Sequence, residues 1–179
     1  MSEVAITSLK ELVHELEMGS GLEGYLGLMH RLKLTKKEVK GLCSWNSKKY
    51  TRNLIERNND YELILMCWEP GQKSLIHSYY DQQGWMYVIE GDLVVNHFFE
   101  SHGEKKMQFY KEIHVKDGRF LYVNDYLGFH SVMNASKGRT VSLHLHAGPV
   151  DKWKVYDPDN NAFFIGKTNY DTQLDLQKE

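Results

Sequence analysis

The chain is poor in cysteine. It has two, Cys43 and Cys67, in 179 residues. Two cysteines are too few for a disulfide framework. Cys67 lies in the apolar run Ile64–Trp68, which predicts a buried thiol that behaves as a small hydrophobic residue. A chain with this cysteine usage is expected in a reducing compartment, the cytoplasm.

A long apolar run and a dominant charge are also absent. No stretch reaches the length that spans a bilayer, and the first residues lack the pattern of a secretory leader. Lys and Arg number 22 against 24 Asp and Glu, and basic residues cluster only in pairs such as Lys36-Lys37. We therefore expect neither a nucleic-acid partner nor a membrane partner.

Internal repeats, low-complexity segments and linkers are missing as well. The composition, with 41% hydrophobic and 26% charged residues, is that of an ordinary globular chain. A chain of this length has room for one domain with its own core. We expect residues 1–179 to form a single domain.

The first part of this domain, residues 1–45, has helical patterning. Ser8–Glu11 has the form of a capping box, in which a serine hydroxyl and a glutamate carboxylate accept from early backbone N–H groups. Apolar residues then recur at helical spacing up to Leu16. Thr35–Glu38 has the same form and predicts the start of a further short helix. His14 and His30 in this region are interpreted as surface or packing residues.

From residue 46 the pattern changes to short runs of β-branched and aromatic residues between turn residues. The runs are Tyr61–Trp68, Ser74–Tyr80, Trp85–Glu90, Leu93–Phe99, Met107–Val115, Phe120–Val123, His130–Asn134 and Val141–Ala147, with weaker candidates near Trp153 and Phe163. Eight or more strands without intervening helices predict a mainly β sandwich or barrel over residues 46–179, capped by the helices.

Histidine is frequent, with nine residues, and several lie in these runs. Alternate residues of a strand share a face, so His77 and Tyr79 point the same way. The same rule separates Val141, Leu143 and Leu145 from Ser142, His144 and His146. Neutral imidazoles from separate strands suit Fe, Zn, Cu or Ni. The set His77, His130, His144 and His146 thus predicts a metal pocket, the alternative being ordinary hydrogen-bonded histidines. His97 and His102 are interpreted as surface residues.

With those residues in view, the sequence resembles the cysteine dioxygenase family. The resemblance spans residues 50 to about 157 and is carried by Tyr50–Leu54, by Leu63–Trp68 with Gly71 and Ile76-His77, by Trp85 with Gly91–Leu93, and by Gly128–Asn134 with Ser142–Leu145. It implies a cupin (jelly-roll) β-barrel holding ferrous iron, Fe(II), on three histidines. Cysteine would bind the iron through thiolate and amine, and O₂ would convert the thiol to a sulfinic acid.

The resemblance also assigns roles to residues of this chain. His77 and His130 match metal ligands, and Arg52 matches the arginine that holds the substrate carboxylate, a task that suits a guanidinium. Tyr50 would face the same pocket. The alternative for Arg52 is a surface ion pair with Glu56.

Two positions differ from the family pattern. Tyr79 replaces the second histidine of a His-x-His motif, and His146 stands where the family has an active-site tyrosine. Gly84 stands where animal members have a cysteine, which bacterial members also lack. Three readings follow: Tyr79 is a metal ligand, the metal has two protein ligands, or His146 supplies the third imidazole. We assign Ser142, His144 and His146 to catalysis. The leading hypothesis is a thiol dioxygenase acting on L-cysteine or a close amino-thiol. The rivals are a cupin that binds a metal or ligand without turnover and a different metal-cupin reaction.

Overall fold

The computed structural model describes residues 4–19, 21, 24–79, 82–101 and 106–176. The helices are α1 (Leu9–Glu17), α2 (Gly24–Arg31) and α3 (Lys36–Val39), with 3₁₀ turns η1 (Lys40–Leu42) and η2 (Asp125–Leu127). The strands are β1 (Thr51–Arg57), β2 (Tyr61–Trp68), β3 (Ile76–Ser78), β4 (Gln83–Glu90), β5 (Asp92–Glu100), β6 (Met107–Lys116), β7 (Phe120–Asn124), β8 (Phe129–Asn134), β9 (Thr140–Ala147), β10 (Lys152–Asp157), β11 (Ala162–Lys167) and β12 (Thr172–Gln173).

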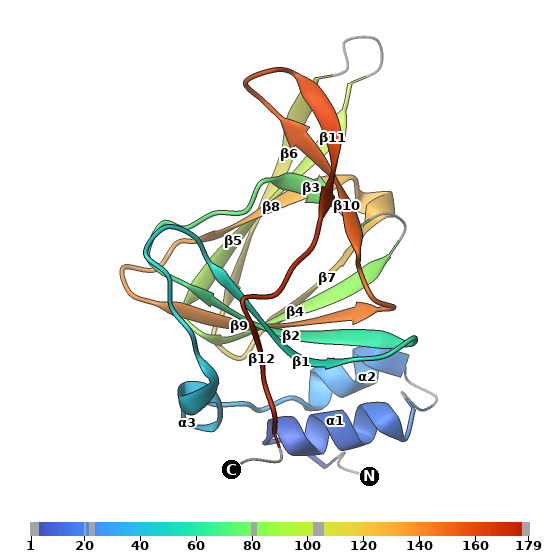
Figure 1. The fold of residues 1–179 in the computed structure, drawn as a ribbon, viewed down its shortest axis with the longest axis vertical. Helices are drawn as coiled ribbons and strands as arrows, with labels where there is room; N and C mark the ends of the chain where they lie inside the picture. Colours follow the sequence, from blue (N-terminus) through green and yellow to red (C-terminus); the bar gives the residue numbers. More distant parts are fainter. Residues whose placement is uncertain (1–3, 20, 22–23, 80–81, 102–105, 177–179) are drawn as a thin grey trace.

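The strands form two six-stranded sheets, in the orders β12-β1-β2-β9-β4-β7 and β11-β10-β3-β8-β5-β6 (Figure 1). The predicted mainly β jelly roll with a helical cap is confirmed. The described strand pairs leave the two sheets separate, so they are not closed into a barrel. Strand β1 was not among the predicted strands, because its polar residues hide the apolar pattern that marks a strand. No helix of the described residues is long and apolar enough to cross a membrane.

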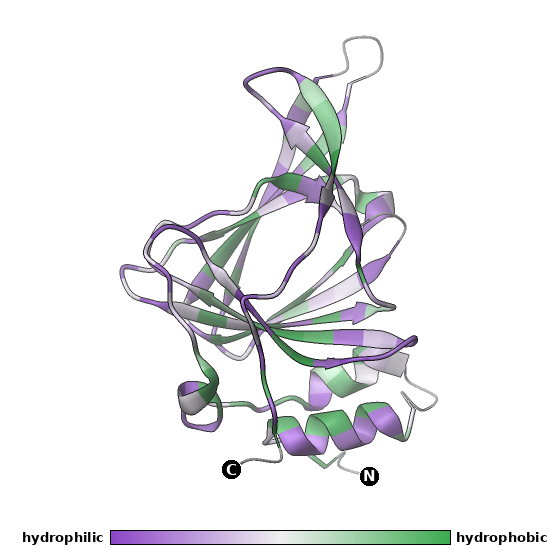
Figure 2. Cartoon of the chain, viewed as in Figure 1, coloured by the Kyte–Doolittle hydropathy of each residue, from purple (hydrophilic) through white to green (hydrophobic). Residues whose placement is uncertain are grey.

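One face of the first sheet packs on the helices, and Figure 1 shows α1 and α2 lying against β1 and β2. Leu143 and Leu145 of β9 join the core formed with Leu9 and Leu12 of α1. The alternating residues of β9 therefore face the space between the sheets. Figure 2 shows this alternation as changes of hydropathy along the strands. The faces predicted for β9 are those observed.

The two predicted capping boxes have different outcomes. Ser8 Oγ accepts from the Glu11 N–H (3.2 Å), and a Glu11 carboxylate oxygen accepts from the Ser8 N–H (3.1 Å), as predicted. The box at Thr35 is wrong, because its side chain makes no capping hydrogen bond. The helix there has four residues, and the Thr35 carbonyl accepts directly from the Glu38 N–H (3.0 Å), which closes the turn through the backbone.

Gly128 sets the position at which β8 begins. Its φ of 86° and ψ of −148° lie in a region that residues with a Cβ rarely adopt. A Cβ there would lie 2.4 Å from the carbonyl oxygen of Phe98, so only glycine allows β8 to approach β5 this closely. His130 follows two residues later, and its place in the interior depends on this turn.

We predict that Gly128→Ala lowers the free energy of unfolding by about 3 kcal/mol, since it adds backbone strain and a backbone clash. The matched control is Gly138→Ala, because a Cβ at Gly138 meets no atom within 4 Å. Urea unfolding followed by tryptophan fluorescence measures both variants. Equal stabilities for the two variants would contradict the role given to Gly128.

Candidate functional site

Two histidines and a tyrosine meet between the sheets. His77 of β3 lies directly opposite His130 of β8, and their ring centroids are 4.3 Å apart. Tyr79 follows β3 and turns its ring toward both, at 4.8 Å from His130 and 5.6 Å from His77. All three side chains are buried. The cross-strand pairing explains why residues 53 positions apart in sequence come together.

The nitrogens of the two histidines are available as ligands. His77 Nδ1 lies 2.8 Å from the Leu75 carbonyl, so it donates its hydrogen there and leaves Nε2 basic. His130 is fully buried, yet neither of its ring nitrogens has a hydrogen-bond partner. Burial lowers the pKa of His77 to about 4 and that of His130 well below its ordinary value. Buried neutral imidazoles with unpaired nitrogens fit the needs of a metal ion.

Tyr79 is the third side chain beside His77 and His130 that has a metal-binding atom. Burial raises the pKa of its hydroxyl, so it is a neutral phenol in the metal-free protein. Its backbone N–H donates to Asp125 Oδ1 (2.7 Å), which holds the segment against η2. Among the described residues, no three His, Cys, Asp or Glu side chains form a group that could hold a metal. The structure thus offers two imidazoles and a phenol.

His146 lies on the other side of Tyr79. Their ring centroids are 4.8 Å apart, and His146 Nδ1 lies 3.1 Å from Oε1 of Glu62. Because an ionised carboxylate only accepts, His146 donates its Nδ1 hydrogen to Glu62. A Cβ on Gly84 would lie 3.0 Å from His146 Cδ2 and 3.2 Å from Tyr79 Cε2. The glycine at this position gives both rings their room.

Ser142 and His144, which the alternation places on one face of the strand, form a hydrogen-bonded pair. Ser142 Oγ lies 2.9 Å from His144 Nε2 and accepts from the indole N–H of Trp68 (3.0 Å). Since indole nitrogen only donates, the serine hydrogen is left for His144. Burial lowers the pKa of His144 well below its usual value, so its imidazole is neutral. The hydrogen bonds from Trp68 to Ser142 and from Ser142 to His144 fix the His144 ring at the edge of the site.

Arg52 of β1 reaches the same interior. It is 8% exposed, and Nη2 lies 3.5 Å from Oε1 of Glu62. Its Nε and Nη2 have no hydrogen-bond partner. Trp153 and Tyr170 flank the guanidinium at 5.9 and 5.7 Å. The alternative surface ion pair with Glu56 is not what the structure shows, since the carboxylate beside Arg52 is that of Glu62.

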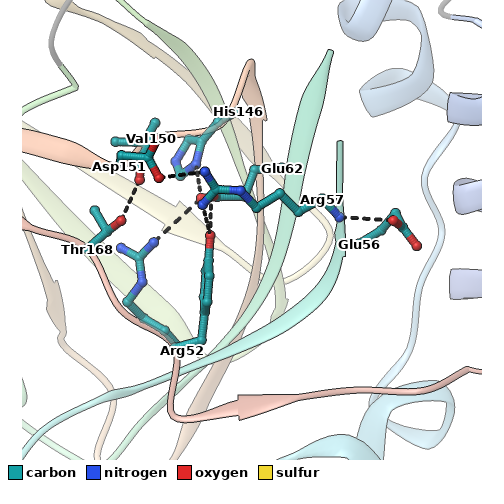
Figure 3. A network of polar contacts seen from close by, with 9 residues as sticks. Arg52, Glu56, Arg57, Glu62, His146, Val150, Asp151 and Thr168 are labelled. Carbon is teal, nitrogen blue, oxygen red and sulfur yellow. Dashed lines mark hydrogen bonds and ion pairs between the residues drawn. The ribbon is translucent and has the colours of Figure 1, made fainter. Parts of the chain in front are cut away.

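Glu62 is the residue that sequence reasoning missed. It is fully buried on β2 and contacts Arg52, Arg57, His146 and the Tyr170 hydroxyl (Figure 3). Burial alone would raise the pKa of its carboxyl, but the hydrogen bond and charge of His146 and the Tyr170 hydroxyl lower it below its usual range. Glu62 is therefore an ionised carboxylate behind the site. A glutamate inside the apolar run of β2 was the available signal.

His97 is also misplaced by sequence reasoning. It was interpreted as a surface residue, but it is buried on β5, directly opposite His130, with the ring centroids 6.4 Å apart. Strand β5 continues to Glu100, so His97 is not at a strand end. The alternation Leu93, Val95, His97 was the signal for an inward side chain. His102 lies outside the described residues.

The cavity among these side chains is small. Its volume is about 20 Å³, which is room for one water-sized molecule. It is lined by Tyr50, Arg52, Met66, Trp68, Ser74, His77, Tyr79, Val132, His144, His146 and Trp153. Every lining residue except Ser74 and Trp153 is a predicted site residue or lies in a stretch that carries the family resemblance. A ligand of amino-acid size enters only if side chains move.

Known proteins of one family are similar to this chain in sequence. Rat cysteine dioxygenase type 1 is 27% identical over 158 residues, which covers 85% of this chain and 78% of that protein. The human protein is 26% identical over 157 residues, with the same coverage. The crystal structure of TT1209 from Thermus thermophilus covers 62% of this chain and 93% of its own, with a TM-score of 0.50 at 22% identity, which shows a shared fold. The family model for cysteine dioxygenase type I matches residues 4–159, and the chain belongs to that family.

Proposed function

We propose that this protein is a non-haem iron thiol dioxygenase, which oxidises L-cysteine or a close amino-thiol to its sulfinic acid with O₂ in the cytoplasm. The observation that carries the proposal is a pair of buried groups whose nitrogens have no hydrogen-bond partner. Arg52 lines the cavity with two such N–H groups, and His130, packed against His77 of the cavity lining, has two such ring nitrogens. Oxygen uptake after L-cysteine is added to iron-loaded protein, with sulfinic acid as the product, tests it.

His77 and His130 would hold the iron, with Tyr79 as the third group beside them. Their neutral, buried state suits a metal that needs a lone pair. When bound, ferrous iron supplies the site at which thiolate and O₂ react. The residues around it contribute binding, orientation and the exclusion of water, since the cavity is closed and small.

Arg52 would hold the substrate carboxylate. Nε and Nη2 form one edge of the guanidinium and present two parallel N–H groups, which is the arrangement that binds a carboxylate in bidentate fashion. Tyr50 stacks on Trp68 (4.4 Å) beside this edge. Burial raises the pKa of Tyr50, so its hydroxyl stays neutral and able to donate to the same carboxylate.

The three residues of β9 would orient the bound thiol. His144 is held by Ser142, and His146 is held by Glu62. Side chains fixed in this way preserve a geometry that free rotamers would lose. His146 packs against Tyr79 and lines the cavity beside it.

A metal-binding or ligand-binding cupin without turnover is the second candidate, and Tyr79 favours it. A phenol has an ordinary pKa near 10 and binds metals well as phenolate, and burial raises the pKa of Tyr79 further. An altered metal-cupin reaction is consistent with the same observation. Oxygen uptake separates these candidates from the dioxygenase.

We predict that His77→Ala and His130→Ala each lose most of the bound iron, because each removes one imidazole of the buried pair whose rings lie 4.3 Å apart. The control is His30→Ala, which alters an exposed histidine on α2. Iron per protein is measured by elemental analysis after loading and desalting. Full iron content in both cavity variants would refute the assignment.

We predict that Arg52→Ala weakens L-cysteine binding by about 1.5–3 kcal/mol, the scale of a hydrogen bond to a charged group. Arg52→Lys should recover part of this, since an ammonium cannot reproduce the two-pronged contact. Arg139→Ala is the control, because Arg139 pairs with Glu69 at the surface. Anaerobic calorimetry measures the affinities, and an unchanged affinity in Arg52→Ala would make Arg52 a structural residue.

Tyr79 gives a spectroscopic prediction. If its phenol binds the metal, the ferric protein has an intense visible phenolate-to-iron band that disappears in Tyr79→Phe. Tyr79→His should raise iron affinity and cysteine-dependent oxygen uptake, because it restores an imidazole at this place. If His146 is the third ligand instead, the band is absent and His146→Ala loses iron as fully as His77→Ala. Unchanged iron content and oxygen uptake in Tyr79→His would show that the tyrosine does not limit the site.

A further inference from the structure

Glu62 lies behind the cavity and does not line it. Its carboxylate is fully buried, and Oε1 is 3.5 Å from Arg52 Nη2 and 3.1 Å from His146 Nδ1. Its other oxygen accepts from Arg57 Nη1 at 3.2 Å and from the Tyr170 hydroxyl. With all these partners, Glu62 is held in place by the protein, as Figure 3 shows, and it is not among the residues that line the cavity.

The arginine and carboxylate charges of this network are equal in number. Arg52 and Arg57 are positive, and Glu62 and Asp151 are negative. Arg57 Nη2 lies 2.5 Å from Asp151 Oδ1, so Arg57 has an exposed carboxylate in addition to Glu62. Glu62 is thus shared between the two arginines, and its Oε1 is the oxygen beside Arg52. The buried guanidinium of Arg52 has a counter-ion before any ligand enters.

Arg52 can still donate hydrogen bonds to a ligand, although Glu62 lies beside it. Its contact with Glu62 is an ion pair at 3.5 Å without a hydrogen bond, and Nε and Nη2 remain unpaired. The residue can receive a carboxylate, but its charge does not require one. A buried cation without a counter-ion would require one, because leaving a buried charge unpaired is strongly unfavourable.

We propose that Glu62 acts as an internal counter-ion for Arg52 and thereby opens this site to amino-thiols that lack a carboxylate, the aminoalkanethiols, alongside cysteine. The inference rests on the proposed function, since it names the substrate class of that same site. An aminoalkanethiol supplies a thiol and an amine but no carboxylate. When it binds, the charge of Arg52 is still compensated by Glu62. A site with Arg52 alone would select for the carboxylate of cysteine.

The wild-type protein provides the first test. Anaerobic calorimetry on iron-loaded protein compares L-cysteine with 2-aminoethanethiol, which differ by the carboxylate. We expect the two dissociation constants to agree within about tenfold, a difference of about 1.4 kcal/mol or less. A stronger preference for L-cysteine overturns the inference and leaves the proposed function intact. If neither thiol binds, the proposed function fails and the inference fails with it.

Removing the internal counter-ion provides the second test. In Glu62→Gln the charge of Arg52 is no longer compensated, so the preference for L-cysteine over 2-aminoethanethiol should rise about tenfold or more. The control is Glu56→Gln, the same chemical change at a glutamate on β1 that contacts the Arg57 backbone and not Arg52. An unchanged ratio in Glu62→Gln, including equal weakening of both thiols, would mean that Glu62 has only a structural role.

The preference ratio is the readout because loss of packing weakens both thiols alike. Thermal melting checks that each variant is folded. If Glu62→Gln alone does not fold, Glu62→Gln with Arg57→Gln removes the second guanidinium that the carboxylate holds and leaves Arg52 uncompensated. The same rise in the ratio is expected in the double variant, and its absence there overturns the inference.

Discussion

The two-residue alternation of β9 decides which side chains the interior contains. Leu143 and Leu145 face the helices, and this places Ser142, His144 and His146 between the sheets. A register shift of one residue would reverse both faces, since the side-chain period of a strand is two. Burial of the apolar face against the helices thus fixes the register of β9. The same register determines where its polar side chains lie. The site depends on helical packing that lies on the far side of the sheet.

Polar groups in this interior are of two kinds. Glu62 and Ser142 have their hydrogen bonds satisfied within the protein. His130 and Arg52 are equally buried but keep unpaired nitrogens. Buried polar groups without partners are costly and uncommon. The satisfied groups hold the structure, and the unsatisfied groups indicate where a metal and a ligand would bind.

The parts of the site that could be predicted from sequence are those with a local signal. Strand alternation and the family motif selected His77, His130 and Arg52, all of which are buried in the structure. Alternation placed Ser142 and His144 on one face, where they are hydrogen-bonded. The helical cap followed from the capping box at Ser8 and the apolar period after it. These features depend on residues a few positions apart.

The rest depends on which strands become neighbours. Glu62 meets Arg52 because β1 pairs with β2, and it meets His146 because β2 pairs with β9, in which Glu62 lies opposite His146. His97 is buried because β5 pairs with β8. Cross-strand register is a tertiary property, and no local pattern within one strand encodes the identity of its partner.

Tyr79 and His146, the two positions that depart from the family pattern, lie beside each other and beside Gly84 in the structure. The Tyr79 ring lies 4.8 Å from that of His146, and a Cβ on Gly84 would come within about 3 Å of both. Interiors are close-packed, so a phenol can replace an imidazole only where a neighbour leaves space. Gly84 leaves that space for the Tyr79 ring, and the His146 side chain, which is shorter than a tyrosine, packs against the same ring. The change at residue 79 is therefore part of one packing arrangement, and a histidine placed there would leave a void beside Gly84. The side chain available to a metal at residue 79 therefore depends on the residues at 84 and 146 that pack against it.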